Sequence, residues 1–222
     1  MNARAAAVPI PLGRRPGENA TRDAILDAAE EEFAASGFAL TSLRAIAERA
    51  GVNQALIRYY FGSKEGLFHV IYARGANHIA EARLKLLDAL EARPEPPTVE
   101  DLVRVFLAPA IEVRRKGAVG AAFMRLQARM QQETEELVQQ IRQDAYDAMS
   151  LRFVAALQRA LPDVEPKTVY WRYVFMVGGY LYTISDANRL AELTGGSQST
   201  AEIDEAVRQM VAFFVAGFTV PG

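Results

Sequence analysis

Apolar residues recur at three- and four-residue steps along most of this chain, the spacing of one face of an α-helix. Ile25, Ala29 and Phe33 share such a face, and acidic residues occupy the positions between them. An amphipathic helix is therefore predicted from about Thr21 to Gly37, where glycine ends it. No segment of useful length alternates apolar and polar residues as a half-buried strand does. The pattern predicts an all-α fold.

Two short helices joined by a glycine turn are predicted next. Thr41 or Ser42 can cap the first, and Asn53 can cap the second, which runs to about Tyr60. Gly51 stands where the chain must turn with a positive φ angle. Such a helix-turn-helix can place its second helix in the major groove of DNA, although any helical hairpin has similar apolar spacing.

The rest of the chain is divided by short loops rich in proline or glycine. Gly62 and Ser63 end the second of these short helices, and Ser63 caps the helix that follows. The further helices are predicted at residues 64–91, 99–116, 118–131, 133–160, 165–192 and 200–217. Pro109 is expected to kink or break the second of these.

These elements predict a small N-terminal three-helix head and a larger C-terminal helical body. Residues 1–20 combine alanine, proline and arginine without apolar periodicity and are expected to form a disordered arm. The head is expected at residues 21–66 and the body at residues 67–222.

Composition supports a folded protein. The 222 residues are 50% hydrophobic and 23% charged, which excludes wholesale disorder. There is no cysteine, so disulfides, thiolate zinc sites and cysteine nucleophiles are excluded. The longest nearly apolar runs, residues 173–184 and 210–220, are shorter than the roughly 20 residues that span a bilayer. No membrane partner and a cytoplasmic location are expected.

Charge is unevenly distributed, although the net charge is only −2. Residues 36–64 contain the bases Arg44, Arg49, Arg58 and Lys64 and the single acid Glu48, a balance of +3. A basic region on an acidic chain is the footprint expected of a protein that meets phosphate at one end. Ordinary scatter of surface charge is the alternative.

Residues 21–72 carry a set of motifs in a characteristic order. They are TR opening the first helix, AA then F before G, T then IA then AGV, and YF-GSKEGLF. This region resembles the N-terminal domain of the tetracycline-repressor-like (TetR) family of bacterial transcription regulators. The resemblance implies a ligand-responsive repressor that binds a palindromic operator on double-stranded DNA as a dimer. Residues 21–66 would then bind DNA, and residues 67–222 would bind the effector and dimerise.

The expected DNA-binding residues are Thr41, Ser42, Asn53, Gln54, Ala55, Leu56, Arg58, Tyr59, Tyr60 and Lys64. From the resemblance, Gln54, Ala55, Leu56 and Tyr59 would face bases, and Thr41, Ser42, Tyr60 and Lys64 would hold phosphates. Gln can donate twice to adenine and Arg twice to guanine, so Arg58 would read a guanine edge or grip a phosphate. The alternative for Leu56 and Tyr59 is packing inside the head.

An effector cavity in the body is also implied by the resemblance. The candidate ligand-binding residues are Phe106, Phe123, Arg125, Arg129, Met149, Phe153, Trp171 and Phe175. The region from Ala122 to Pro162 is similar to family members that respond to acyl chains, so Arg125 or Arg129 would pair with a carboxylate or phosphate head group. The alternatives are ordinary core packing for the large apolar residues and solvation at the surface for the arginines.

The last two helices are predicted to form a homodimer interface from residues 165–192 and 200–218. Gly178 and Gly179 cost stability in mid-helix unless another helix approaches closely. The last helix has an apolar face too wide for a lone surface helix. That face consists of Val207, Met210, Val211, Phe214, Val215 and Phe218.

Two other classes of protein fit the sequence less well. An enzyme lacks support, because His69 and His78 do not share a helix face, no phosphate loop or nucleophile elbow occurs, and no cofactor or metal site is predicted. A helical lipid-binding or adaptor protein would leave the turn chemistry of residues 41–64 unexplained. Salt-dependent binding to a palindromic duplex would separate a regulator from both.

Overall fold

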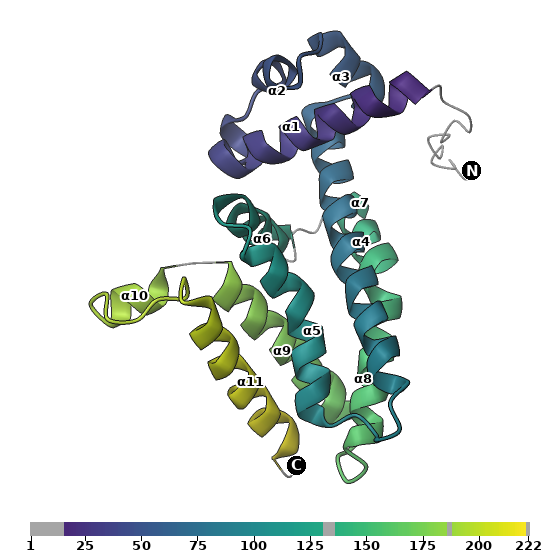
Figure 1. The fold of residues 1–222 in the computed structure, drawn as a ribbon, viewed down its shortest axis with the longest axis vertical. Coiled ribbons are helices and arrows are strands. Elements are labelled where there is room, and N and C mark those ends of the chain that lie inside the picture. The colour runs from purple at the N-terminus through teal and green to yellow at the C-terminus, as the bar shows by residue number, and fades with distance from the viewer. Residues whose placement is uncertain (1–15, 131–135, 186–187, 221–222) are drawn as a thin grey trace, which may run out of the picture.

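The computed structural model describes residues 16–130, 136–185 and 188–220, and the regular elements in these ranges are all helices (Figure 1). The all-α prediction is confirmed. The head contains α1 (Pro16–Leu40), α2 (Leu43–Ala50) and α3 (Gln54–Phe61). The body contains α4 (Lys64–Glu91), α5 (Val99–Arg114), α6 (Ala118–Met130), α7 (Glu136–Arg142), the π-helical turn η1 (Gln143–Asp147), α8 (Ala148–Ala160), α9 (Pro166–Ile184), α10 (Arg189–Leu193) and α11 (Ile203–Thr219).

The head is built around its own apolar core, to which the start of α4 contributes. Ile25 and Ala29 of α1 lie in this core with Ile46 of α2 and Ile57 of α3. Four α4 residues complete it: Leu67, Phe68, Ile71 and Tyr72. The core of the head therefore extends beyond the expected domain boundary at residue 66.

The first helix begins earlier than expected. It starts at Pro16 rather than near Thr21, because proline is well suited to the first helical position, where its missing N–H is not needed. Residues 1–15 of the expected arm lie outside the described residues. Gly37 interrupts the helix, as predicted, with φ 75° and ψ 164°.

The body helices differ from the expectation at three places. α5 continues through Pro109, which is buried, so the proline does not break the helix. The helix expected at residues 165–192 ends at Ile184, and Asn188 has a left-handed φ of 52° that no continuous α-helix accommodates. In the helix expected at residues 133–160, a π-helical turn separates α7 from α8, and residues 133–135 lie outside the described residues.

The body core lies between α4 and the helices packed on it. The Phe106 ring is central, with ring centroids 5.1 Å from Phe153, 5.6 Å from Tyr173 and 5.5 Å from Tyr180, all edge to face. α4 runs from the head along the body, while α6 packs against α1 (Figure 1). Head and body are thus joined by two helices. Within the described residues, none of the helices is long and apolar enough for a bilayer crossing.

Candidate nucleic-acid interface

The turn between α2 and α3 is formed by local hydrogen bonds. Gly51 adopts a left-handed conformation with φ 66°, and its N–H donates to the Glu48 carbonyl. The side chains of Ser42 and Asn53 accept hydrogen bonds from the first turns of α2 and α3. The predicted caps are therefore confirmed, and they fix where α2 and α3 begin.

The outward surface of α3 lies at the end of the head farthest from the body (Figure 1). Ile57 is buried beneath it, whereas Tyr59 is 70% exposed and Leu56 is 37% exposed. Packing of Leu56 and Tyr59 inside the head is therefore excluded. Arg58 is exposed as well. The exposed or half-exposed residues from the predicted set on this helix are Gln54, Ala55, Leu56, Arg58, Tyr59 and Tyr60.

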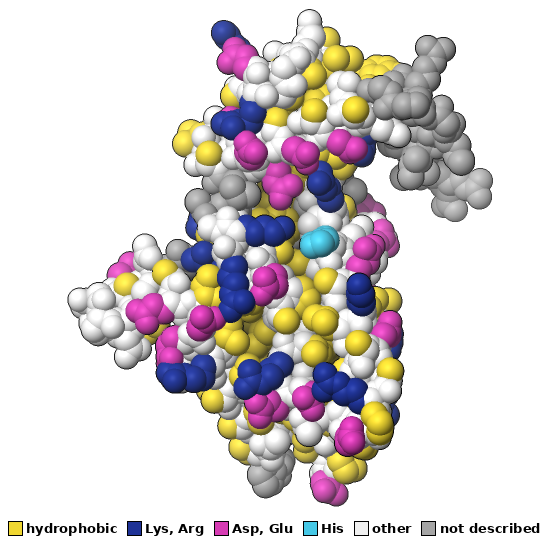
Figure 2. All heavy atoms as spheres, in the orientation of Figure 1, with side chains coloured by type: hydrophobic (Ala, Val, Ile, Leu, Met, Phe, Trp, Pro, Cys, Tyr) yellow, Lys and Arg dark blue, Asp and Glu magenta, His cyan; other side chains and the backbone are white. Residues whose placement is uncertain are grey.

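Two of the four basic residues in the region 36–64 form ion pairs within the head. Arg49 pairs with Glu31 at 2.8 Å and with Glu32 at 2.6 Å, and Arg44 pairs with Glu48 at 2.8 Å. Figure 2 shows acidic side chains in a row along α1, on the body side of α2 and α3. Within the described part of the chain, Arg58 has no ion pair, so it is the cation of this region left available to DNA.

Lys64 does not face outward as a phosphate ligand. Its Nζ donates to the carbonyl oxygens of Phe38 at 2.8 Å and Thr41 at 3.1 Å, and it lies 4.4 Å from the centroid of the Phe38 ring. The carbonyl groups at the end of α1 attract a cation, because they carry the negative end of the helix dipole. Lys64 therefore fastens the α1–α2 connection, and its donors are directed into the head rather than outward.

Thr41 is also placed differently from the prediction. It is only 3% exposed, and its hydroxyl donates to the carbonyl oxygens of Glu32 at 3.0 Å and Gly37 at 2.8 Å. Its hydroxyl hydrogen is therefore committed within the head. Ser42 stays exposed at the start of α2, where backbone N–H groups favour a phosphate, so Ser42 and Tyr60 remain phosphate candidates.

Lys64→Ala is expected to lower the free energy of unfolding by about 1–3 kcal/mol, because partly buried carbonyl groups lose their donor. Urea denaturation followed by circular dichroism measures the change. Lys85→Ala is the matched control, since Lys85 is an exposed cation on the same helix. Equal stability of the two variants would contradict the bracing role.

The predicted ligand-binding residues divide into two groups. Phe106, Phe123, Met149 and Phe153 come together in the body core. Trp171 and Phe175 do not join them, since they are 63% and 65% exposed on the outer side of α9. Arg125 is exposed on α6, and the side chain of Arg129 lies outside the described residues.

The sequence pattern did not reveal three buried polar side chains on α4 and α6. Arg83 is 1% exposed, and Gln127 and Tyr72 are similarly buried. A signal was available, because Ala76, Ile79 and Leu87 place Arg83 within the apolar stripe of α4. Within the described ranges, no three His, Cys, Asp or Glu side chains are grouped so that they could hold a metal ion.

The apolar face of α11 was predicted to be covered by a second subunit, but most of it is buried within one subunit. Met210, Val211, Phe214 and Phe218 are buried within the subunit, where α11 packs on α5 and α9. A Cβ atom at Gly179 would lie 3.1 Å from the Phe214 ring, so this glycine permits close approach within one subunit. The last helix therefore completes the body core.

The exposed apolar surface lies on α9 instead. Its members share one face of the helix at three- and four-residue steps: Trp171, Val174, Phe175, Gly178 and Tyr182. We call these five residues the α9 stripe. A Cβ atom at Gly178 would meet no heavy atom within 4 Å, so the centre of the stripe is open to a second helix.

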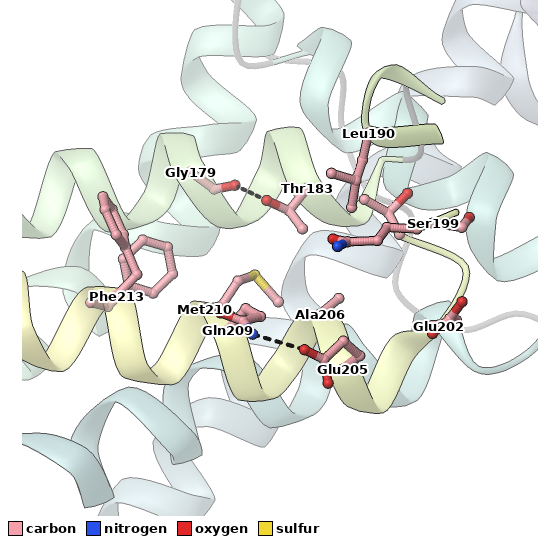
Figure 3. A pocket seen from close by; sticks show the side chains of 13 residues that line it. Gly179, Thr183, Leu190, Ser199, Glu202, Glu205, Ala206, Gln209, Met210 and Phe213 are labelled. Carbon is pink, nitrogen blue, oxygen red and sulfur yellow. Dashed lines mark hydrogen bonds between the residues drawn. The ribbon is translucent and has the colours of Figure 1, made fainter. Parts of the chain in front are cut away.

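A cavity of about 620 Å³ lies beside this surface, between α9 and α11 (Figure 3). Thr183 and Gly179 line one side, and Gln209, Met210 and Phe213 line the other. Phe213 is 75% exposed there. The cavity and the α9 stripe together leave considerable apolar surface uncovered in one subunit.

Two family models match this chain. Residues 25–71 match the model described as bacterial regulatory proteins of the tetR family, and residues 104–217 match the one described as the tetracyclin repressor-like C-terminal domain. The second match alone spans half of the chain. The two matched regions correspond to the head with the start of α4 and to most of the body.

Relatives and solved structures agree with these matches. The HTH-type transcriptional regulator AcrR of Shigella flexneri is 33% identical over 43% of this chain and 45% of its own. The HTH-type transcriptional repressor NicS of Pseudomonas putida is 42% identical over 34% of this chain and 37% of its own. The chain thus matches less than half the length of these curated relatives. FadR of Bacillus subtilis, solved in complex with stearoyl-CoA, has the same fold with a TM-score of 0.64 at 15% identity, covering 88% of this chain and 98% of that one.

Proposed function

This chain belongs to the TetR family of transcription regulators, and from that premise we propose that it is a repressor that binds a palindromic operator as a homodimer and is released by a small apolar effector. The observation that carries the proposal is the outward surface of α3. Its polar and apolar side chains are exposed on a helix held by capped, hydrogen-bonded neighbours. A rigid helix with exposed donors is what reading base edges requires.

On α3, roles follow from side-chain chemistry. Gln54 can donate to and accept from adenine, and Arg58 can donate twice to guanine. The exposed Leu56 and Ala55 gain free energy against a thymine methyl group. Ser42 and Tyr60 would bind flanking phosphates and set the orientation of the head.

A dimer follows from the α9 stripe. One head covers too few base pairs for useful specificity, and two heads related by a twofold axis read an inverted repeat. The α9 stripes of two subunits can pair around the open centre at Gly178, and Phe213 lies on the adjacent helix. The heads would then reach successive major grooves, about 34 Å apart or a multiple of that distance.

Sequencing of the genomic fragments retained by the purified protein tests this function. We expect the fragments to share an inverted repeat and their binding to weaken steeply as salt concentration rises, because phosphate contacts release counterions. Retention of fragments without a common sequence would refute a sequence-specific regulator. No retention at all would favour the lipid-binding or adaptor alternative.

Arg58→Ala and Gln54→Ala are expected to change which operator sequence is preferred. Each good bidentate base contact contributes about 1–3 kcal/mol of discrimination, so affinity for the matching base pair should fall roughly 5- to 150-fold relative to a mismatch. Fluorescence anisotropy on operators varied at single positions measures the change, with Lys85→Ala as control. If both variants keep the wild-type preference, another surface of the head reads the bases.

Response to an effector is supported by the apolar, aromatic body. FadR of Bacillus subtilis, which shares the fold, was solved with stearoyl-CoA. An acyl compound is one apolar molecule of this kind. An effector that lowers operator affinity must bind less tightly to the DNA complex by the same factor, because coupling between two sites is reciprocal.

A further inference from the structure

Arg83 lies in the middle of α4, where it is almost completely buried. Its Nε donates to the Phe106 carbonyl at 2.7 Å, and its guanidinium carbon is 3.7 Å from the Phe106 ring centroid and 5.1 Å from that of Tyr180. Its Nη2 atom has no hydrogen-bond partner. In the part of the chain that the structure describes, no carboxylate pairs with this arginine.

Two other buried groups, one on α4 and one on α6, also lack hydrogen-bond partners within the described residues. They are the Tyr72 hydroxyl and the Gln127 Nε2 atom. The Gln127 Oε1 atom accepts a hydrogen bond from the Tyr146 hydroxyl at 3.0 Å. Burial raises the pKa of Tyr146, and the positive charge of Arg83 opposes this rise. Tyr146 of the π-helical turn thus hydrogen-bonds Gln127 and lies within electrostatic range of Arg83 and Tyr72.

All three unpaired groups can donate a hydrogen bond. Burial raises the pKa of Tyr72 to about 12, so its hydroxyl keeps its proton at neutral pH. The amide nitrogen of Gln127 and the guanidinium of Arg83 are donors only. Each of the three donors therefore lacks an acceptor within the described residues, and the buried Arg83 cation has no carboxylate to balance its charge there.

The surroundings restrict what kind of anion fits. One guanidinium balances one negative charge, so a dianion would leave a buried charge uncompensated. The rings of Phe106 and Tyr180 flank the cation, and Phe153 and Tyr173 pack against the Phe106 ring. These contacts favour a monoanion that carries an apolar group.

We propose that Arg83 anchors the carboxylate of a small apolar acid, with Tyr72 and Gln127 as additional donors, and that this acid is the effector. The second part of this assignment rests on the proposed function. The first part concerns binding alone and does not require DNA.

The donors lie on helices that also touch the head. Tyr72 belongs to the apolar core of the head, and Leu126, the neighbour of Gln127 on α6, packs against the same core. α4 begins at Lys64, which fastens the α1–α2 connection. A ligand that moves Tyr72 or Gln127 would therefore shift the parts of α4 and α6 that pack against the core of the head.

Calorimetry on the full-length protein without DNA tests the anchor. The probes are straight-chain carboxylates from butanoate to decanoate and phenylacetate, with octanamide and octyl phosphate for comparison, all below their micelle thresholds. We expect at least one carboxylate to bind about tenfold or more tightly than the neutral amide, because a charge-assisted hydrogen bond is lost in the amide. Arg83→Met should weaken that carboxylate at least tenfold, while Lys85→Met leaves it unchanged.

Thermal melting separates binding from a structural role. Arg83→Met should melt at the wild-type temperature or higher, since it replaces an uncompensated buried charge by an apolar chain. Tyr72→Phe should weaken the carboxylate with unchanged melting. The anchor is overturned if no carboxylate binds, if Arg83→Met binds it as wild type does, or if octyl phosphate binds more tightly than octanoate.

An operator-release assay with the same acid tests the effector role separately. A lower operator affinity in wild type but not in Arg83→Met supports it. Binding of the acid without any change in operator affinity overturns the effector role alone. A protein that binds no operator refutes the proposed function, while calorimetry still decides the anchor.

Discussion

Replacing Val174 and Phe175 together by glutamate is expected to turn the proposed dimer into monomers and to weaken operator binding by about 100-fold or more. Both side chains lie near the middle of the α9 stripe and are mostly exposed in one subunit. In a twofold interface each substitution occurs twice, so four carboxylates would be brought together without partners. Linking two binding heads contributes about 10²- to 10⁴-fold in avidity, which monomers lose.

Light scattering gives the oligomeric state, and anisotropy with a labelled operator gives the affinity. Leu151→Glu is the matched control, because Leu151 is exposed to a similar degree but lies on α8, outside the α9 stripe. The control should remain a dimer with wild-type affinity. A dimeric double variant would show that another surface joins the subunits, and a monomeric wild-type protein would refute the dimer.

Gly66→Ala is expected to destabilise the head by about 3 kcal/mol and to abolish operator binding at moderate concentrations. A Cβ atom at this position would lie 2.2 Å from the Phe61 carbonyl oxygen, which belongs to the backbone at the end of α3. Overpacking against an atom that cannot rotate away requires the start of α4 and the end of α3 to separate. The exposed surface of α3 would then no longer be held in its position on the head.

Thermal and urea unfolding, with operator binding at low temperature, measure this effect. Gly217→Ala is the control, because a Cβ atom there would meet no heavy atom within 4 Å on the helix α11. It should be neutral or more stable by up to about 1 kcal/mol, the helix propensity of alanine over glycine. Equal stabilities for the two variants would mean that the connection between α3 and α4 accommodates the extra Cβ atom without a loss of folding free energy.

The amino-acid sequence determined the local structure of the head. Ser42, Asn53 and Ser63 cap their helices where expected, and Gly51 turns with a positive φ angle. These features depend on hydrogen bonds between residues two to four positions apart and on the conformational freedom of glycine. The spacing of apolar residues likewise determined the helical class of the whole chain, because the helical period is a local property.

Only the tertiary structure determined which residues far apart in the chain form hydrogen bonds and ion pairs with each other. Lys64 could equally have met a phosphate, but the end of α1 lies beside it and occupies its donors. Arg49 looks free to bind phosphate in the sequence, but α1 places Glu31 and Glu32 beside it, and it forms ion pairs with both. A positive charge in the sequence therefore does not indicate a positive surface until the acids that fold against it are known.

The two apolar helices at the end of the chain illustrate the same limit. Their sequences show wide apolar faces, but only packing determines that α11 turns Met210 and Phe214 inward while α9 leaves Trp171 and Phe175 in solvent. Arg83 stands among apolar residues in the sequence, and only the folded body shows it buried without a carboxylate. Helical period and caps are set by neighbours in sequence, whereas burial and charge compensation are set by neighbours in space, which the chain acquires when its helices pack.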